Sequence, residues 1–141
     1  MTRLFLLLTT LLLADAAGGA EPGLRVVVNE ANPVTSLSRE ELADLFLKKV
    51  SSWGDGTLVL PVDQLEETAV RENFNREILR KSSNAVRAYW QQRIFAGRDI
   101  PPPERESDGA VLAFVRRNRG AIGYVSAESS MAGVKALTVR R

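Results

Sequence analysis

The chain has 141 residues, of which 45% are hydrophobic and 26% charged, a composition typical of one small globular domain. It contains no Cys and no His, which excludes a disulfide framework, a Ser-His-Asp triad, a Cys–His nucleophile pair and a structural zinc site. The net charge of +2 is far from that of a nucleic-acid-binding protein, and we expect no nucleic-acid partner, metal or cofactor.

Residues 1–20 have the pattern of a secretory signal peptide. Arg3 supplies the positive start, residues 4–13 are an almost unbroken apolar run, and small residues follow in two places that suit cleavage, after Ala16 or after Ala20. The alternative interpretation is a membrane anchor, but spanning a bilayer takes about 20 apolar residues. We therefore expect export to the periplasm, with cleavage after Ala20 preferred, a mature domain of residues 21–141, and no membrane span after cleavage.

The first half of the mature chain predicts two strands and two helices. Residues 24–29 are a β-branched run that favours a strand buried on both faces. Ser38 and Glu41 fit a capping box and predict that a helix begins there. Residues 57–62 favour a second strand, which ends or lies at a sheet edge at its proline. Residues 68–80 predict a second helix capped by its first residue, a threonine.

The second half predicts two more helices and further strands. The apolar residues within 86–94 mark a third helix, and the three consecutive prolines within 97–105 predict an extended connector. A fourth helix begins at Ser107 or Asp108, with Gly120 predicted to close it. The remaining strands are expected over residues 121–125 and 134–139. The sequence thus predicts one α/β domain, a mixed sheet flanked by about four helices.

The order of several short motifs resembles the substrate-binding proteins of phosphate ABC transporters, in the type 2 periplasmic binding-protein superfamily. The motifs are Ser-Arg-Glu-Glu-Leu at 38–42, Leu-Phe at 45–46, Trp-Gly-Asp-Gly at 53–56, Pro-Val at 61–62 and Gly-Ala-Ile-Gly-Tyr-Val at 120–125. The resemblance covers residues 24–127, and the last motif is its most specific part. Members of this family have two lobes and more than twice this length, so the resemblance implies a short relative with a single lobe.

The resemblance also implies where an anion would bind. In the family, a Ser-Gly-Thr-type segment opens a helix, and its hydroxyls and backbone N–H groups hold the anion. The matching positions here are Thr68, Ala69 and Val70, which keep one hydroxyl and no glycine. Arg71 follows in the first turn and is the cation placed to fold over such a site. Ser38, at the start of the first helix, is a further candidate contact.

Two carboxylates oppose an anion at this place. Glu66 and Glu67 lie directly before the helix and already complement its positive end. The alternative interpretation is that Thr68 is only a helix cap and Arg71 a solvated surface residue. The aromatic residues Tyr89 and Trp90, with Phe95 beyond them, also leave two interpretations open: core packing, or an exposed groove for a partner or an aromatic ligand.

Two functional hypotheses follow. The first is a non-catalytic solute-binding module for phosphate or another oxyanion, with Thr68, Arg71 and Ser38 as its contacts. The second is an interaction module that has lost the solute site and binds a periplasmic protein or the outer domain of a sensor. Glu66 and Glu67 favour the second, as does the missing lobe, whereas a dimer that rebuilt the cleft would favour the first. The sequence leaves the oligomeric state open.

Overall fold

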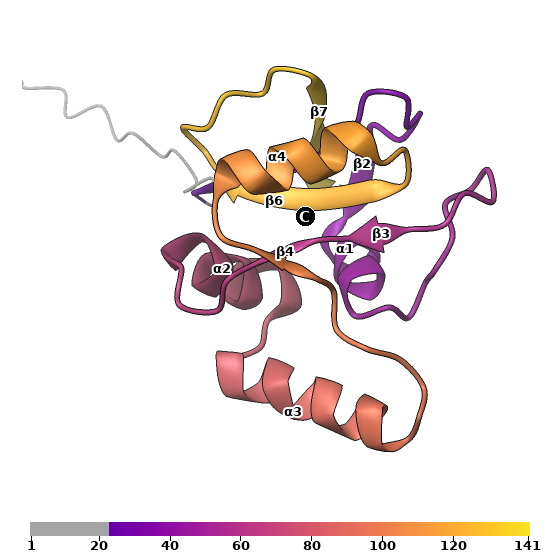
Figure 1. Ribbon diagram of the computed structural model, residues 1–141, viewed down its shortest axis with the longest axis vertical. Helices are drawn as coiled ribbons and strands as arrows, with labels where there is room; N and C mark the ends of the chain where they lie inside the picture. Colours follow the sequence, from indigo (N-terminus) through magenta and orange to yellow (C-terminus); the bar gives the residue numbers. More distant parts are fainter. Residues whose placement is uncertain (1–22) are drawn as a thin grey trace, which may run out of the picture.

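A five-stranded mixed sheet lies at the centre of the computed structural model, which describes residues 23–141 (Figure 1). Its strands, in spatial order, are β2 (Ser36–Ser38), β7 (Val134–Arg140), β1 (Leu24–Asn29), β6 (Ala121–Ser126) and β3 (Leu60–Pro61). The central strand β1 is antiparallel to both neighbours, whereas β2 is parallel to β7 and β3 is parallel to β6. The predicted signal peptide, residues 1–20, lies outside the described residues.

The strand β1 is buried on both faces, as its β-branched sequence predicts. Val26 and Val28 belong to one apolar cluster, while Val27, between them in the strand, belongs to a second. This alternation follows from the period of two in a strand. Both clusters consist of residues between Leu24 and Val139, so a chain of residues 21–141 keeps all of these core residues.

Helices cover both faces of the sheet. The helices α1 (Arg39–Phe46) and α2 (Ala69–Phe74) pack on the face that carries Val26, and α2 continues directly into a π-helix, η1 (Asn75–Leu79). The opposite face carries α4 (Asp108–Arg117). The helix approaches β6 so closely at Gly123 that a Cβ there would lie 2.7 Å from Val111 Cγ1.

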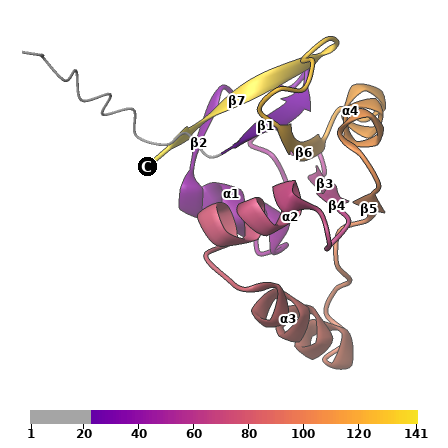
Figure 2. The same cartoon turned by 90° about the vertical axis from the view of Figure 1, so that its left-hand side faces the viewer.

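The helix α3 (Ser83–Phe95) lies apart from the sheet, at the bottom of Figures 1 and 2. Residues in the middle of α3 attach it to the rest of the fold. Val86 and Trp90 are buried in the larger cluster, and the Tyr89 hydroxyl donates to the Leu47 carbonyl at 2.6 Å. Its last residue, Phe95, is exposed. Of the two interpretations of these aromatics, core packing is therefore confirmed for Trp90 and does not apply to Phe95.

Several predicted elements differ from the structure in extent. The strand expected over residues 57–62 is reduced to β3, an edge strand that ends at its proline as predicted. The helix expected over residues 68–80 forms as α2 and η1, and Arg80 ends it in the left-handed conformation with φ of 52°. None of the helices within residues 23–141 has the length and apolar character that a membrane span requires.

The prediction that Gly120 closes the fourth helix is wrong. The helix ends at Asn118, whose extended backbone turns the chain out of the helix. Gly120 does not adopt the left-handed conformation of a helix-closing glycine. It is needed because a Cβ there would lie 1.9 Å from the Leu58 carbonyl oxygen.

Candidate functional site

A second, two-stranded sheet positions the polar residues nearest to the predicted anion site. After β3, Val62 is buried and the chain continues into β4 (Asp63–Gln64), which pairs in parallel with β5 (Glu104–Arg105). Asp63 and Glu104 are direct partners in this pairing. The short strand β5 lies within the segment that the sequence predicts as an extended connector. It brings a carboxylate from the proline-rich region to the start of α2.

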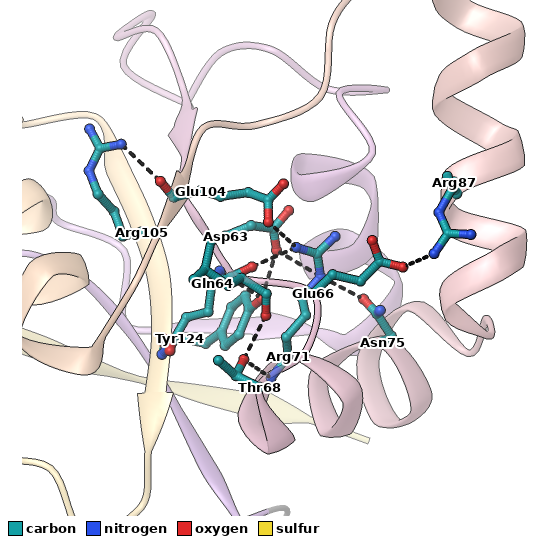
Figure 3. A network of polar contacts seen from close by, with 11 residues as sticks. Asp63, Gln64, Glu66, Thr68, Arg71, Asn75, Arg87, Glu104, Arg105 and Tyr124 are labelled. Carbon is teal, nitrogen blue, oxygen red and sulfur yellow. Dashed lines mark hydrogen bonds and ion pairs between the residues drawn. The ribbon is translucent and has the colours of Figure 1, made fainter.

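Arg71 occupies the middle of this cluster, as Figure 3 shows. The residue is almost fully buried, at 8% exposure. The guanidinium donates from Nη1 to the Gln64 carbonyl at 2.7 Å and from Nε to Asn75 Oδ1 at 3.3 Å. It also forms ion pairs with Asp63 at 3.6 Å and Glu104 at 3.7 Å. Arg71 is therefore neither the solvated surface residue of the alternative interpretation nor a free cation.

Tyr124 closes the cluster from the side of the sheet. Its hydroxyl donates to Asp63 Oδ1 at 2.7 Å and accepts from the Gln64 backbone N–H at 3.2 Å. Its ring stacks on Phe74 of α2, with 4.0 Å between the ring centroids. Burial raises the pKa of Tyr124, and the neighbouring Asp63 carboxylate raises it further. The hydroxyl consequently keeps its proton and remains a donor.

The protonation of Asp63 is governed by opposing effects. Burial raises the pKa of its carboxyl from 3.8 to about 6, while Arg71 and the Tyr124 hydroxyl act in the other direction. A buried carboxylate with one cation and one hydrogen-bond donor is stabilised in its charged form, but less than water would stabilise it. We call Asp63, Gln64, Arg71, Asn75, Glu104 and Tyr124 the Arg71 network.

The charges of the Arg71 network do not favour an added anion. One guanidinium faces two carboxylates, Asp63 and Glu104, so the cluster is already negative when both are ionised. Two unit charges 4 Å apart interact by about 4 kcal/mol at an effective dielectric of about 20. An anion that took Arg71 from Asp63 would give up an attraction of that order and leave a buried carboxylate unpaired.

The Thr68 hydroxyl also makes its hydrogen bonds within the chain. It accepts from the Arg71 backbone N–H at 3.3 Å and donates to the Leu65 carbonyl at 2.8 Å, which makes Thr68 the cap of α2. Of the two glutamates before it, Glu67 is exposed, while Glu66 is half-buried and pairs with Arg87 of α3. The structure thus brings Thr68 and Arg71 together, but the contact joins the Thr68 hydroxyl to the backbone N–H of Arg71.

Ser38 makes its contacts elsewhere. Its hydroxyl accepts from the Glu41 N–H at 3.1 Å, and the Glu41 carboxylate accepts from the Ser38 N–H at 2.8 Å. The predicted capping box is therefore confirmed. The carboxylate also pairs with Arg140 of β7 at 3.2 Å. None of the contacts that the structure describes for Ser38 reaches Thr68 or Arg71.

Of the Arg71 network, sequence reasoning singled out only Arg71 as a candidate contact. Glu104 lies in the predicted connector, Tyr124 in a predicted strand and Asn75 in a predicted helix, and none of the three was singled out. A signal was available for Asn75, because it lies four residues after Arg71 and so shares its face of the helix. Its Nδ2 is buried and has no hydrogen-bond partner within the described residues. Glu104 gave no such signal.

Two other kinds of site are relevant to the described residues around the network, a metal site and the positive end of a helix. No group of three or more His, Cys, Asp or Glu side chains that could hold a metal ion is found within residues 23–141. At the start of α4, the Asp108 carboxylate accepts from Gln64 Nε2 at 2.6 Å and from the Ser126 N–H at 3.2 Å. Although partial burial raises the pKa of Asp108, these hydrogen bonds lower it below its usual value. The positive end of α4 is thus already occupied by a carboxylate.

Solved structures of similar fold include a phosphate transport receptor and a putative substrate-binding protein of a phosphate transporter. An ABC-type phosphate transport receptor from Vibrio cholerae matches with a TM-score of 0.66 at 23% identity, over 83% of this chain and 46% of its own. A putative phosphate ABC transporter substrate-binding protein from Clostridium perfringens, solved with bound phosphate, matches with a TM-score of 0.67 at 19% identity, over 83% of this chain and 44% of its own. The fold is that of one periplasmic binding-protein lobe.

The PstS protein from Borrelia burgdorferi matches similarly, with a TM-score of 0.65 at 14% identity, over 84% of this chain and 47% of its own. This chain spans less than half the length of these three structures. The predicted fold class, a single α/β lobe with a mixed sheet and flanking helices, is confirmed. No family model matches the chain. Membership of the phosphate-transporter family and the phosphate ligand therefore stay predictions.

Proposed function

We propose that this chain is a non-catalytic binding module, built on a single lobe of the periplasmic binding-protein type, that binds another periplasmic protein. The observation that carries the proposal is the position of Arg71. Its guanidinium is enclosed by two carboxylates, an amide oxygen and a backbone carbonyl. The cation that the sequence places to hold an anion at the start of α2 is thereby used inside the fold.

The surface around the Arg71 network suits a protein partner. Leu65 is 39% exposed and is followed by Glu66 and Glu67 at the beginning of α2. Glu104 and Glu106, also exposed, lie on and beside β5, the partner strand of β4. An exposed leucine among carboxylates favours a partner with an apolar contact and basic residues around it, because complementary charges steer association.

A second candidate function is the binding of phosphate or another oxyanion by Thr68, Arg71 and Ser38. Two observations favour it: the structures of similar fold include phosphate-binding proteins, and the amide nitrogen of Asn75 is a buried donor beside Arg71 with no partner within the described residues. Oxyanion binding requires the Arg71 guanidinium to leave Asp63. It also requires another copy of the chain to supply the second side of the binding cleft.

The proposed compartment rests on residues 1–20, which we propose are a signal peptide. The proposal that the chain is not an enzyme rests on its composition. With neither His nor Cys, a nucleophile and its base would have to be assembled from Lys, Ser, Thr, Tyr or carboxylates.

Thermal unfolding of residues 21–141 with phosphate, sulfate or molybdate separates the two candidates. A ligand at about 100 times its Kd adds about 2.7 kcal/mol to the stability of the folded state, which raises the Tm of a domain of this size by several degrees. We expect no selective shift from any of the three anions. A phosphate-selective shift that is lost in Arg71→Met and kept in Arg87→Met would establish the second candidate instead.

Photo-crosslinking in living cells tests the protein partner. A photoreactive amino acid at Leu65 is expected to give a discrete adduct with a periplasmic protein. The matched control is the same amino acid at Glu30, an exposed position directly after the last residue of β1. Absence of any adduct from Leu65, or the same adducts from both positions, would contradict the proposed interaction at this surface.

A further inference from the structure

Most of the exposed large apolar side chains of the described residues come from two segments of the chain. Six large apolar side chains are exposed, and all but Leu65 lie in or near two segments, residues 50–58 and 94–100. They are Val50, Leu58, Ile94, Phe95 and Ile100, with Phe95 at 93% exposure and Ile100 at 66%. We call Ile94, Phe95 and Ile100 the α3 tip.

The two segments are adjacent in space. An ion pair of 3.6 Å joins Lys48 to Asp99, which lies directly before Ile100. Val50 and Leu58 line a hollow of about 220 Å³ together with Asp99 and Pro103. We call the α3 tip together with Val50 and Leu58 the apolar end. The helix α3 lies apart from the sheet (Figure 2), whereas Leu58 lies two residues before β3.

Cations surround this apolar end. Residues 48–58 and 93–100 contain four of them, Lys48, Lys49, Arg93 and Arg98. They also contain two carboxylates, Asp99, which is paired with Lys48, and Asp55, which is paired with Arg119. The helix α3 itself has Arg87 and Arg93 and no acidic residue. Arg93 lies over the Tyr89 ring, at 5.4 Å from its centroid, while Arg98 is exposed between Phe95 and Ile100.

This combination fits an anionic lipid surface. Interfacial segments place aromatic and aliphatic side chains among the headgroups and acyl chains, and keep Lys and Arg at the level of the phosphates. A bilayer accepts a protruding apolar tip without complementary shape, whereas a stable protein interface needs about 800 Å² of fitted surface on each partner. We propose that the α3 tip docks this protein on anionic membranes. The proposal does not rest on the protein-binding function proposed above.

Vesicle flotation with residues 21–141 tests this docking, because that form keeps the whole described core and lacks the apolar run at residues 4–13. The probes are vesicles of phosphatidylcholine with phosphatidylglycerol and vesicles of phosphatidylcholine alone. We expect binding to the anionic vesicles at low salt, much weaker binding at high salt, and little binding to the neutral ones.

Two variants and one matched control identify the surface. Phe95→Ala and Arg98→Glu should each weaken the partition to anionic vesicles about tenfold or more. Leu65→Ala removes the one large apolar side chain that is exposed outside this end within residues 23–141, and it should leave the partition unchanged. All three positions are exposed, so circular dichroism and Tm should match the parent chain.

Three results would overturn the proposal. The first is no binding of the folded chain to anionic vesicles at low salt. The second is binding that Phe95→Ala and Leu65→Ala leave equally strong, which would place the contact elsewhere. The third is a protein adduct from a photoreactive amino acid at Phe95 in cells, together with no vesicle binding, which would assign the α3 tip to a protein partner.

Discussion

The Arg71 network and the α3 tip depart from the usual pattern of burial in opposite directions. The network places a guanidinium and a carboxylate inside the protein, at 8% and 6% exposure, while the tip leaves a phenylalanine at 93% exposure. Burial of charge is costly unless every charged group is paired, and exposure of one apolar residue costs little. Contacts within the fold account for the buried charges of the network. The contacts of the described residues do not account for the exposed apolar side chains of the tip.

This contrast explains why the resemblance and the structure point to different functions for one segment. The resemblance predicts an anion-binding helix start at Thr68, and the fold is similar to one lobe of solved phosphate-transport proteins. The contacts, however, use the Thr68 hydroxyl and the Arg71 guanidinium within the chain. A shared backbone can therefore keep the position of a site while its donors take on a structural role.

Loss of Arg71 should have the largest effect on stability. Arg71→Met leaves Asp63 buried without its cation, and removal of one partner from a buried pair costs about 3–5 kcal/mol. Arg87→Met is the matched control, because Arg87 pairs with Glu66 at the surface, where such pairs contribute about 0–1 kcal/mol. Urea unfolding at neutral pH measures both. Equal losses from the two variants would contradict a structural role for Arg71.

The pH dependence of stability should report on Asp63. The pKa of its carboxyl is about 6 in the folded chain, against an ordinary value of 3.8. The folded state thus holds this proton more tightly than the unfolded state. The contribution of Asp63 to the free energy of unfolding is largest below about pH 4 and falls by about 3 kcal/mol up to about pH 6.

Unfolding of the parent chain and of Asp63→Asn between about pH 4 and pH 7 isolates this contribution. The free energy of unfolding of the parent chain, relative to that of the variant, should decrease as the pH rises. A relative stability that increases over the same range would mean that Arg71 outweighs burial and that the pKa of Asp63 is lowered.

Removal of the Tyr124 hydroxyl should have an intermediate effect. Tyr124→Phe keeps the ring that stacks on Phe74 but deletes the donor to Asp63 and the acceptor of the Gln64 N–H. The Gln64 N–H is left without this acceptor, at about 1–3 kcal/mol, while Asp63 keeps its ion pair with Arg71. Urea unfolding should show a loss of that order, smaller than the loss from Arg71→Met. No loss would show that the hydroxyl is dispensable to the network.

Changes at the α3 tip should have the smallest effect on stability. Phe95→Ala removes a side chain that is almost fully exposed, so the free energy of unfolding should change by no more than about 0.5 kcal/mol. The contrast with Arg71→Met in the same unfolding assay would separate a surface available for binding from a structural cluster. A large loss from Phe95→Ala would show that Phe95 supports the fold.

The strongly patterned elements were predictable from the sequence. The β-branched run of β1, the capping box of Ser38 and Glu41, and the apolar faces of the helices all depend on local periodicity. The closing residue of α4 was not predicted. Gly120 looks like a helix-closing glycine in the sequence, but it is required by the Leu58 carbonyl, which is distant in sequence.

The candidate site was predictable only in part, for the same reason. Thr68 and Arg71 are near each other in the chain, and their role as the start of a helix followed from the sequence. The partners of Arg71 come from β4 and β5, and the pairing of Asp63 with Glu104 joins residues that are 41 positions apart. Local patterns carry no information on such a pairing, and it is this pairing that determines whether the guanidinium is free.

A double-mutant cycle between Asp63 and Arg71 is the most direct test that Arg71 is committed to the fold. Unfolding free energies are measured for the parent chain, Asp63→Asn, Arg71→Met and the double variant. A direct buried pair predicts that the double variant loses less than the sum of the single losses, by about 1–3 kcal/mol. Single losses that add within about 0.5 kcal/mol would contradict the account and leave Arg71 available for a ligand.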